Sequence, residues 1–302
     1  MHESPGASPA RPGRGVVIGQ LVLVVLFWAS TFPISKVALE ETTPLLLAGM
    51  RYAVSGVLLG VWWGLQARAN THAGPIPWWG IVAFALAGVV GFNAFFYLGL
   101  AQSTAVNGSL IQPTTAATAT ALLAWAFLRE RLAPWRYLAF PLATAGVTLV
   151  ILGDPARKID PSSLLGNLFF VLGGSSFALS NVIGRRLFRR TPTVLAVVVG
   201  NPLGALVLLL VSVGEGGWPG LLHASWRVWA AVAWMGLLAT GLGYLWWYEG
   251  VRRLGATRTG VFTFLVPVVG AFLSVIFLGE SLQILQIVGG LLALLGVALV
   301  LL

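Results

Sequence analysis

The chain has 302 residues, of which 58% are hydrophobic and only 9% are charged, and its mean hydropathy is +0.90. Soluble domains carry about a quarter of their residues as charged side chains, so this composition excludes that class and predicts a polytopic helical membrane protein. The net charge of +9 comes from arginines near the ends of apolar runs, which indicates membrane topology rather than a nucleic-acid surface. The absence of cysteine excludes disulfides and thiolate metal sites, and we expect neither a metal nor a cofactor.

Apolar runs occupy almost the whole chain after a short polar tail. Residues 1–14 are rich in Pro, Gly and Ser, which predicts a disordered segment. Each later run is long enough to cross a hydrocarbon core about 30 Å thick. The predicted spans are residues 16–36, 44–64, 77–98, 104–127, 134–152, 163–184, 192–213, 226–248, 258–278 and 282–302. The short connectors between them predict that consecutive helices are antiparallel neighbours.

The chain contains two copies of one unit, offset by 150 positions. FLRERL, which ends at Leu132, recurs as FLGESL ending at Leu282, so Glu130 aligns with Glu280. Further pairs at this offset are Phe27 and Phe177, Ser30 and Ser180, Trp79 and Trp229, Gly91 and Gly241, Ala143 and Ala293, and Gly146 and Gly296. Internal repeats of this kind build many transporter folds. We therefore predict a tail at 1–14, a first five-helix repeat at 15–153 and a second at 154–302.

Five spans is an odd number, so the second copy is expected to cross the membrane in the direction opposite to the first. The connectors give the absolute orientation, because Lys and Arg accumulate on the cytoplasmic side. With both termini cytoplasmic, the inner basic residues are Arg11, Arg14, Arg68, Arg129, Arg131, Arg136, Arg185, Arg186, Arg189, Arg190, Arg252, Arg253 and Arg258. The outer ones are Lys36, Arg51, Arg157, Lys158 and Arg227. The predicted fold is an all-α polytopic membrane protein with ten transmembrane helices, arranged as two inverted five-helix repeats with cytoplasmic N- and C-termini.

Polar and aromatic side chains at membrane depth need partners that lipid does not offer, and they gather on corresponding spans of the two copies. The side chains predicted to line a substrate site are Trp28, Ser30, Asn93, Tyr97, Gln112, Thr115, Asn181, Tyr244, Trp247 and Thr263. Three prolines, Pro33, Pro113 and Pro267, are predicted to bend their helices and to serve gating. No Asp or Glu lies in the middle of a span. We therefore expect a site without an ionised side chain, suited to a neutral or zwitterionic molecule.

Each of these features has a structural alternative. A buried hydroxyl can bond to its own helix, a Trp or Tyr near a span end can belong to the interfacial belt, and a proline can serve curvature alone. Glu249, at the inner end of span 8, is expected to pair with Arg252 or Arg253. Without an intramembrane carboxylate or histidine, facilitated diffusion or exchange is favoured over proton-driven transport. No nucleophile elbow, Walker motif or HExxH motif is present, so an enzyme is not expected.

The ten spans, the inverted repeat, FWASTFPISKVAL in span 1 and the paired FLRERL and FLGESL motifs resemble the drug/metabolite transporter superfamily, specifically its EamA-type exporters. The aromatic-rich character is similar to the YddG-type aromatic amino-acid exporters of bacterial inner membranes. The resemblance implies export of aromatic and other neutral amino acids through a central cavity built by spans 1, 3, 4, 6, 8 and 9. One departure is that Pro113 of the first copy stands a turn earlier than Pro267 of the second.

We therefore expect a secondary transporter that exports aromatic and other neutral amino acids across a bacterial inner membrane by alternating access. Its partners are a small-molecule substrate and the bilayer, with no nucleic acid, and small residues in span 10 are compatible with a monomer or a weak homodimer. Two alternatives stay open. The cargo could be a nucleobase, a sugar or a drug-like cation, although a cation would find no cavity carboxylate. The protein could also be a structural or receptor-like membrane protein that transports nothing.

Overall fold

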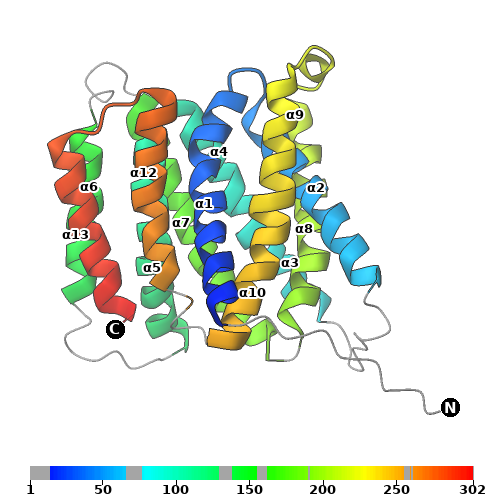
Figure 1. The fold of residues 1–302 in the computed structure, drawn as a ribbon, viewed down its shortest axis with the longest axis horizontal. Helices are drawn as coiled ribbons and strands as arrows, with labels where there is room; N and C mark the ends of the chain where they lie inside the picture. Colours follow the sequence, from blue (N-terminus) through cyan, green and yellow to red (C-terminus); the bar gives the residue numbers. More distant parts are fainter. Residues whose placement is uncertain are drawn as a thin grey trace.

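The computed structural model describes residues 14–65, 77–128, 138–154, 162–189, 191–254, 259 and 261–301. Within these ranges the helices form ten segments in the predicted order, which we number as spans 1 to 10, and the all-helical organisation is confirmed (Figure 1). The predicted disordered tail lies outside the described residues except for Arg14, the first residue of α1.

Seven spans consist of one α-helix each. They are α1 (Arg14–Ala38), α2 (Pro44–Leu65), α5 (Ala105–Leu128), α6 (Ala139–Gly153), α7 (Ser162–Leu187), α8 (Thr193–Ser212) and α13 (Ile284–Leu301). Spans 3, 8 and 9 each consist of more than one helical element. Span 3 contains α3 (Trp78–Ala85), the π turn η1 (Leu86–Gly91) and α4 (Phe92–Gln102), and span 8 contains α9 (Trp226–Ala233), the π segment η6 (Trp234–Leu242) and α10 (Gly243–Leu254). Span 9 contains the 3₁₀ turn η7 (Val261–Phe264) and α12 (Leu265–Leu278). Short 3₁₀ turns, η4 (Val213–Glu215) and η5 (Pro219–Leu222), precede α9.

Length and apolar composition allow most of these segments to cross a bilayer. Six described stretches are long and apolar enough by themselves: Arg14–Ala38, Pro44–Leu65, Trp78–Gln102, Ser162–Leu187, Val194–Glu215 and Trp226–Trp247. Three shorter apolar helices cover Phe140–Gly153, Leu265–Leu278 and Ile284–Leu299. Large apolar side chains on the outside, such as Trp79 at 87% exposure and Phe277 at 72%, would face lipid.

The helices pair according to the repeat. Equivalent spans contact each other directly in α6 with α13, α2 with α8, and α5 with α12. The remaining large contacts come in equivalent sets: α7 packs on α5 and span 3, and α1 packs on α12 and span 8. Figure 1 shows α6 and α13 at one edge of the bundle and α2 and α8 toward the other. The spans that carry most polar residues therefore occupy the middle.

Spans 3 and 8 contain π-helical turns at equivalent positions, which hydrophobic periodicity does not predict. The offset of 150 maps η1 onto residues 236–241, inside η6. Glycine permits the close packing that these turns need. A Cβ at Gly236 would lie 2.9 Å from the carbonyl oxygen of Arg51. The widened turn of span 8 thus packs directly on the backbone of α2.

Two boundaries differ from the sequence prediction for identifiable reasons. Span 8 continues beyond residue 248, where its apolar run ends, to Leu254, because Glu249 forms the expected ion pair with Arg253 one turn later. Span 9 begins with the 3₁₀ turn η7, and Pro267 is the third residue of α12. A proline in the first helical turn removes no intrahelical hydrogen bond, so Pro267 is accommodated at a helix start rather than inside one.

The small residues of span 10 are used within the chain. Gly289 of α13 meets Gly146 of α6 so closely that a Cβ on Gly146 would lie 2.6 Å from the carbonyl oxygen of Gly289 and 2.4 Å from the amide nitrogen of Ala293. Close backbone approach of this kind is how small residues hold membrane helices together. These glycines accordingly give no support for a dimer.

Gly146→Leu is expected to destabilise the protein by about 1–3 kcal/mol, because a side chain at this position overpacks the contact between α6 and α13. A thermal unfolding scan in detergent would show a lower melting temperature. Gly60→Leu is the matched control, since a Cβ at Gly60 meets nothing within 4 Å. Equal melting temperatures for the two variants would contradict the close approach of the two helices.

Candidate functional site

Three of the predicted site residues form an aromatic cluster between spans 1 and 8. The ring of Trp28 lies 5.9 Å from that of Tyr244 and 5.0 Å from that of Trp247, centroid to centroid. The indole Nε1 of Trp28 donates to the carbonyl oxygen of Ala239 at 2.9 Å. That carbonyl belongs to η6, so the π turn supplies the acceptor that fixes the Trp28 ring. The equivalent turn η1 is bonded in the same manner, because Ser176 of α7 donates to the carbonyl oxygen of Ala87 at 2.9 Å.

A buried arginine lies beside this cluster. Arg51, which the charge count assigns to an outer connector, stands instead seven residues into α2 and is only 7% exposed. Its Nε donates to the Thr240 hydroxyl at 2.7 Å and its Nη1 to the Tyr97 hydroxyl at 3.4 Å. The guanidinium also lies 5.6 Å from the centroid of the Tyr52 ring. An ionised side chain therefore contacts Tyr97, one of the predicted site residues, where the sequence analysis expects none.

Two predicted amides remain partly unpaired in the interior. Asn93, fully buried on α4, donates through Nδ2 to the carbonyl oxygen of Val89 at 2.7 Å, while its Oδ1 has no hydrogen-bond partner. Gln112 of α5 is 3% exposed, and its Nε2 is also unpartnered. Buried polar atoms are nearly always hydrogen-bonded in proteins, so such exceptions mark places where a ligand or water can bind.

Gln112 and Thr115 face α7 where that helix has no side chains. A Cβ at Gly173 would lie 2.9 Å from Nε2 of Gln112, and a Cβ at Gly174 would lie 2.9 Å from Cβ of Thr115. The same position on Gly173 is 3.3 Å from the carbonyl oxygen of Phe92, next to Asn93. Spans 3, 4 and 6 thus bring Asn93, Gln112 and Thr115 to one region.

The other predicted residues lie apart from these groups. The Ser30 hydroxyl donates to the carbonyl oxygen of Phe27 at 2.9 Å and accepts from the indole Nε1 of Trp234 at 3.0 Å. Trp234 is 39% exposed, so Ser30 bonds to a ring on the surface of the bundle. Asn181 donates to the Thr120 hydroxyl at 3.1 Å. Thr263 lies in η7, at the start of span 9. Pro33 and Pro113 stand inside the continuous helices α1 and α5.

Glu280, the glutamate of FLGESL, connects the loop after span 9 to the start of span 4. Its carboxylate accepts from the backbone amides of Ala105 at 2.8 Å and Val106 at 2.7 Å, which are free donors at the N-terminus of α5. Burial raises the pKa of Glu280, while these two amides and the nearby Lys36 favour its charged form. Lys36 in turn donates to the carbonyl oxygens of Leu100 and Ser103 at 2.5 Å. Glu130, its repeat equivalent, lies outside the described residues.

Buried amides extend this connection across the same end of the bundle. Gln286 of α13 donates to Oδ1 of Asn107 at 2.7 Å, and Asn107 donates to Oδ1 of Asn167 on α7 at 3.1 Å. Asn167 also accepts from the Ser103 hydroxyl at 2.7 Å and donates to Asp154 at 3.4 Å. We call the set Lys36, Ser103, Asn107, Asp154, Asn167, Glu280 and Gln286 the outer-end network. It joins spans 1, 4, 6 and 10 where the chain turns around on the side opposite to the termini.

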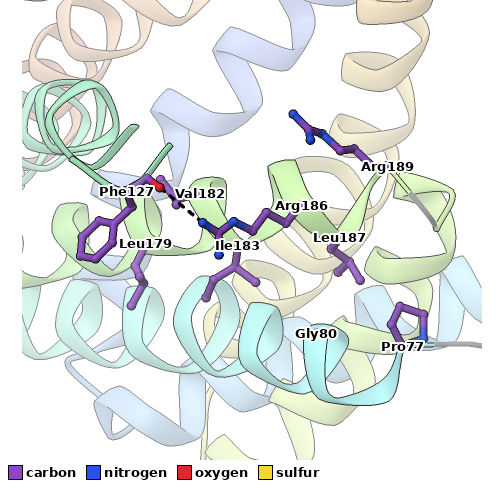
Figure 2. Close-up of a pocket in the computed structure, with 9 residues that line it drawn as sticks. All are labelled: Pro77, Gly80, Phe127, Leu179, Val182, Ile183, Arg186, Leu187 and Arg189. Atoms are coloured by element: carbon purple, nitrogen blue, oxygen red, sulfur yellow. Dashed lines mark hydrogen bonds between the residues drawn. The ribbon is translucent and has the colours of Figure 1, made fainter. Parts of the chain in front are cut away.

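Figure 2 shows a different feature, a pocket of about 730 Å³ between α3, α5 and α7. Its lining is Pro77, Gly80, Phe127, Leu179, Val182, Ile183, Arg186, Leu187 and Arg189. Arg186 donates to the carbonyl oxygen of Phe127 at 3.3 Å, and Phe127 and Leu179 are 62% and 45% exposed. The pocket lining is mostly apolar apart from Arg186 and Arg189, and it contains none of the predicted site residues. We do not assign it to a polar solute.

The protein-family comparison matches this chain twice. The model of the EamA-like transporter family covers residues 15–152 and again residues 164–302. The chain belongs to the EamA-like transporter family. It is therefore a multi-pass membrane transporter made of two EamA halves, and it is not an enzyme.

Relatives of this EamA protein include transporters from distant organisms. It is 30% identical to the uncharacterized transporter YyaM of Bacillus subtilis, over 90% of this chain and 89% of that protein. It is 28% identical to a "probable terminal-alkyne amino-acid exporter" of Streptantibioticus cattleyicolor, over 93% of this chain and 91% of that protein. A crystal structure that is 21% identical superposes with a TM-score of 0.63 over 95% of this chain and 96% of the other, which shows a shared fold.

Glu280→Ala is expected to lower the stability of this EamA protein by about 0.5–2 kcal/mol, the range for losing a helix N-cap, because two amides of α5 lose their acceptor. Thermal unfolding in detergent measures the effect. Glu40→Ala, an exposed glutamate of the connector after α1, is the control and should leave the melting temperature unchanged. If Glu280→Ala unfolds at the wild-type temperature, the carboxylate does not stabilise the start of α5.

Proposed function

We propose that this protein is a secondary transporter that exports amino acids with aromatic or other apolar side chains across a bacterial inner membrane. The observation that carries the proposal is the junction of spans 1 and 8, where the Trp28, Tyr244 and Trp247 rings lie beside buried polar groups. Stacked rings bind an apolar or aromatic side chain, and buried donors and acceptors orient a polar group. The amino-acid cargo in the name of the Streptantibioticus relative supports the same substrate class.

The helix pairing supports two inverted repeats. Exchanging the two copies maps the packing of α7 on spans 3 and 4 onto the packing of α1 on spans 8 and 9. The hydroxyl bonds follow the exchange as well: Ser180 donates to the carbonyl oxygen of Phe177 at 2.7 Å, as Ser30 does to that of Phe27. A substrate held between inverted copies is reached from either side by rocking one group of spans against the other.

The outer-end network supports alternating access with a barrier on the outer side. It joins spans 1, 4, 6 and 10 through side chains rather than through covalent connections, so it can break and reform during a cycle. In the described spans, acidic side chains lie only near helix ends, where Glu249 pairs with Arg253 and Asp154 bonds to Ser163. This distribution favours facilitated diffusion or exchange over a proton relay through the interior.

The topology predicts which connectors are reached from outside the cell, and the chain contains no cysteine to interfere with labelling. His223→Cys, in the exposed connector before α9, should react with an impermeant maleimide in intact cells. Arg189→Cys, exposed after α7, should react only after the membrane is opened. The reverse pattern would place both termini outside, and labelling of both sites in intact cells would contradict a membrane crossing by α8, the one helical span between them.

Proteoliposomes of the pure protein should take up radiolabelled tryptophan and phenylalanine saturably, with rates indifferent to an imposed pH gradient. Threonine tests whether neutral side chains without a ring are also carried. Gradient-dependent flux would contradict facilitated diffusion and direct attention to Glu249. No flux of any amino acid would refute the proposed cargo while leaving the family and the fold intact, and nucleobases, sugars and cations would be tested next.

Trp247→Ala should reduce the tryptophan flux about tenfold or more, because stacking of an aromatic ring contributes about 0.5–1.5 kcal/mol beyond the buried area that is also lost. Trp79→Ala is the matched control, since Trp79 is 87% exposed on the outside of span 3. Flux through both variants is normalised to the amount of folded protein in the liposomes. Equal fluxes would remove the aromatic cluster from the substrate site.

A further inference from the structure

We propose that Arg51 is the anchor for the substrate's carboxylate, so that the protein selects solutes that carry a carboxylate beside an aromatic or apolar group. The assignment rests on the proposed function, which it extends by naming the charged group of the substrate and the side chain that binds it. Three observations carry it: the charge of Arg51 has no counter-ion among the described residues, the groups around it are preorganised, and a free acceptor for an ammonium group lies one helical turn from Tyr97, which Arg51 contacts.

The charge of Arg51 has no counter-ion among the residues that the structure describes. Its hydrogen bonds go to the neutral hydroxyls of Thr240 and Tyr97, and no described carboxylate lies within ion-pair distance. A buried charge without a partner is strongly destabilising, and ionisable residues inside membrane spans are normally paired or functional. Arginine cannot relieve the strain by losing its proton. The missing partner is therefore most simply a negative charge that the substrate brings.

Neutral hydroxyl acceptors and a tyrosine ring hold the guanidinium in a fixed orientation. Thr240 lies in η6 of span 8 and Tyr97 lies in α4 of span 3, so equivalent spans of the two copies both contact this side chain. Tyr52 lies against one side of the guanidinium at 5.6 Å. A planar guanidinium fixed through Nε and Nη1 keeps its remaining N–H groups available, and this fork matches the two oxygens of a carboxylate.

The aromatic cluster and Arg51 share the same π segment. Ala239 of η6 accepts from Trp28, and its neighbour Thr240 accepts from Arg51. Tyr244, whose ring contacts Trp28, follows four residues after Thr240 on the same span. One ligand with a carboxylate and a nearby ring can therefore contact both groups at once.

The acceptor for an ammonium group is Oδ1 of Asn93. It is fully buried, it has no partner, and its amide orientation is fixed because Nδ2 donates to the carbonyl oxygen of Val89. Asn93 and Tyr97 are four residues apart on α4, which places their Cβ atoms about 5–6 Å from each other on one face. Tyr97 contacts Arg51. The site thus offers a cation bonded to Tyr97 and a neutral acceptor one turn earlier on the same helix, and we propose that these two groups bind the two ends of a zwitterion.

Binding to the detergent-purified protein tests the assignment with four ligands that keep the indole ring. They are tryptophan, tryptophan amide and tryptamine, both of which lack the carboxylate, and indole-3-propionate, which lacks the ammonium. Wild type is expected to bind tryptophan at least about tenfold more tightly than tryptophan amide or tryptamine, the scale of a lost charge-assisted hydrogen bond in a buried site. Equal affinity for tryptophan and its amide would overturn the proposal, even if no variant were made.

Arg51→Gln should abolish this preference, lowering tryptophan affinity about tenfold or more while leaving tryptamine affinity unchanged. Arg51→Lys should retain part of the preference, because it keeps the charge without the fork. Arg227→Gln, which removes an exposed arginine at the start of α9, is the control and should behave as wild type. A variant that folds and still prefers tryptophan over its amide would also overturn the proposal.

Asn93→Ala separates the two ends of the ligand. It should weaken tryptophan binding and leave indole-3-propionate unchanged, whereas a purely structural role for Asn93 would weaken both alike. Proteoliposome flux of the wild type keeps the two levels of inference distinct. If wild type carries no amino acid, the proposed function fails. If wild type carries tryptophan and tryptophan amide equally well, the proposed function stands and the role of Arg51 fails.

Discussion

The hydrocarbon core of the bilayer offers no hydrogen-bond partner, so each interior polar group of this transporter must find its partner within the protein. The backbone meets it by forming helices. Some side chains meet it within their own helix, as Ser30 does by bonding to Phe27. Others bond from one copy to the other: Trp28 of the first copy bonds to η6 of the second, and Ser176 of the second bonds to η1 of the first. The two copies are therefore held together by the same polar atoms that apolar packing alone would leave unsatisfied. Arg51, with its charge and no described counter-ion, is the place where the constraint is met least completely.

Much of the architecture follows from the sequence because apolar length and repeat offset are strong signals. Ten spans, their order and most of their limits are predictable, since lipid forces each apolar run into a helix. Spans 3 and 8 show where the signal ends. A π turn changes hydrogen bonding without changing composition, so η1 and η6 leave only a local richness in glycine as a trace.

The sequence identifies candidate site residues by type, but it does not say which of them are neighbours in the fold. The rings of Trp28, Tyr244 and Trp247 meet, although they are distant in the chain. Ser30 has the same composition signal and points elsewhere, toward Trp234, because residues two positions apart on a helix occupy different faces. Arg51 was available to sequence reasoning as a basic residue inside an apolar run. The positive-inside rule assigns each arginine to its nearest connector, so it counts Arg51 with a connector although the side chain lies in the interior.

The paired π turns have a geometric effect on everything beyond them. One extra residue in a turn rotates the rest of the helix by about 100° around its axis. The outer half of span 3 and the inner half of span 8 are therefore each turned relative to a straight helix. In the predicted orientation, one of these halves leads toward each side of the membrane, so the two copies carry the same swivel pointing in opposite directions. A rotation about the π turn of one copy, which moves the half-span on the cytoplasmic side, therefore has an equivalent rotation about the π turn of the other copy, which moves the half-span on the opposite side.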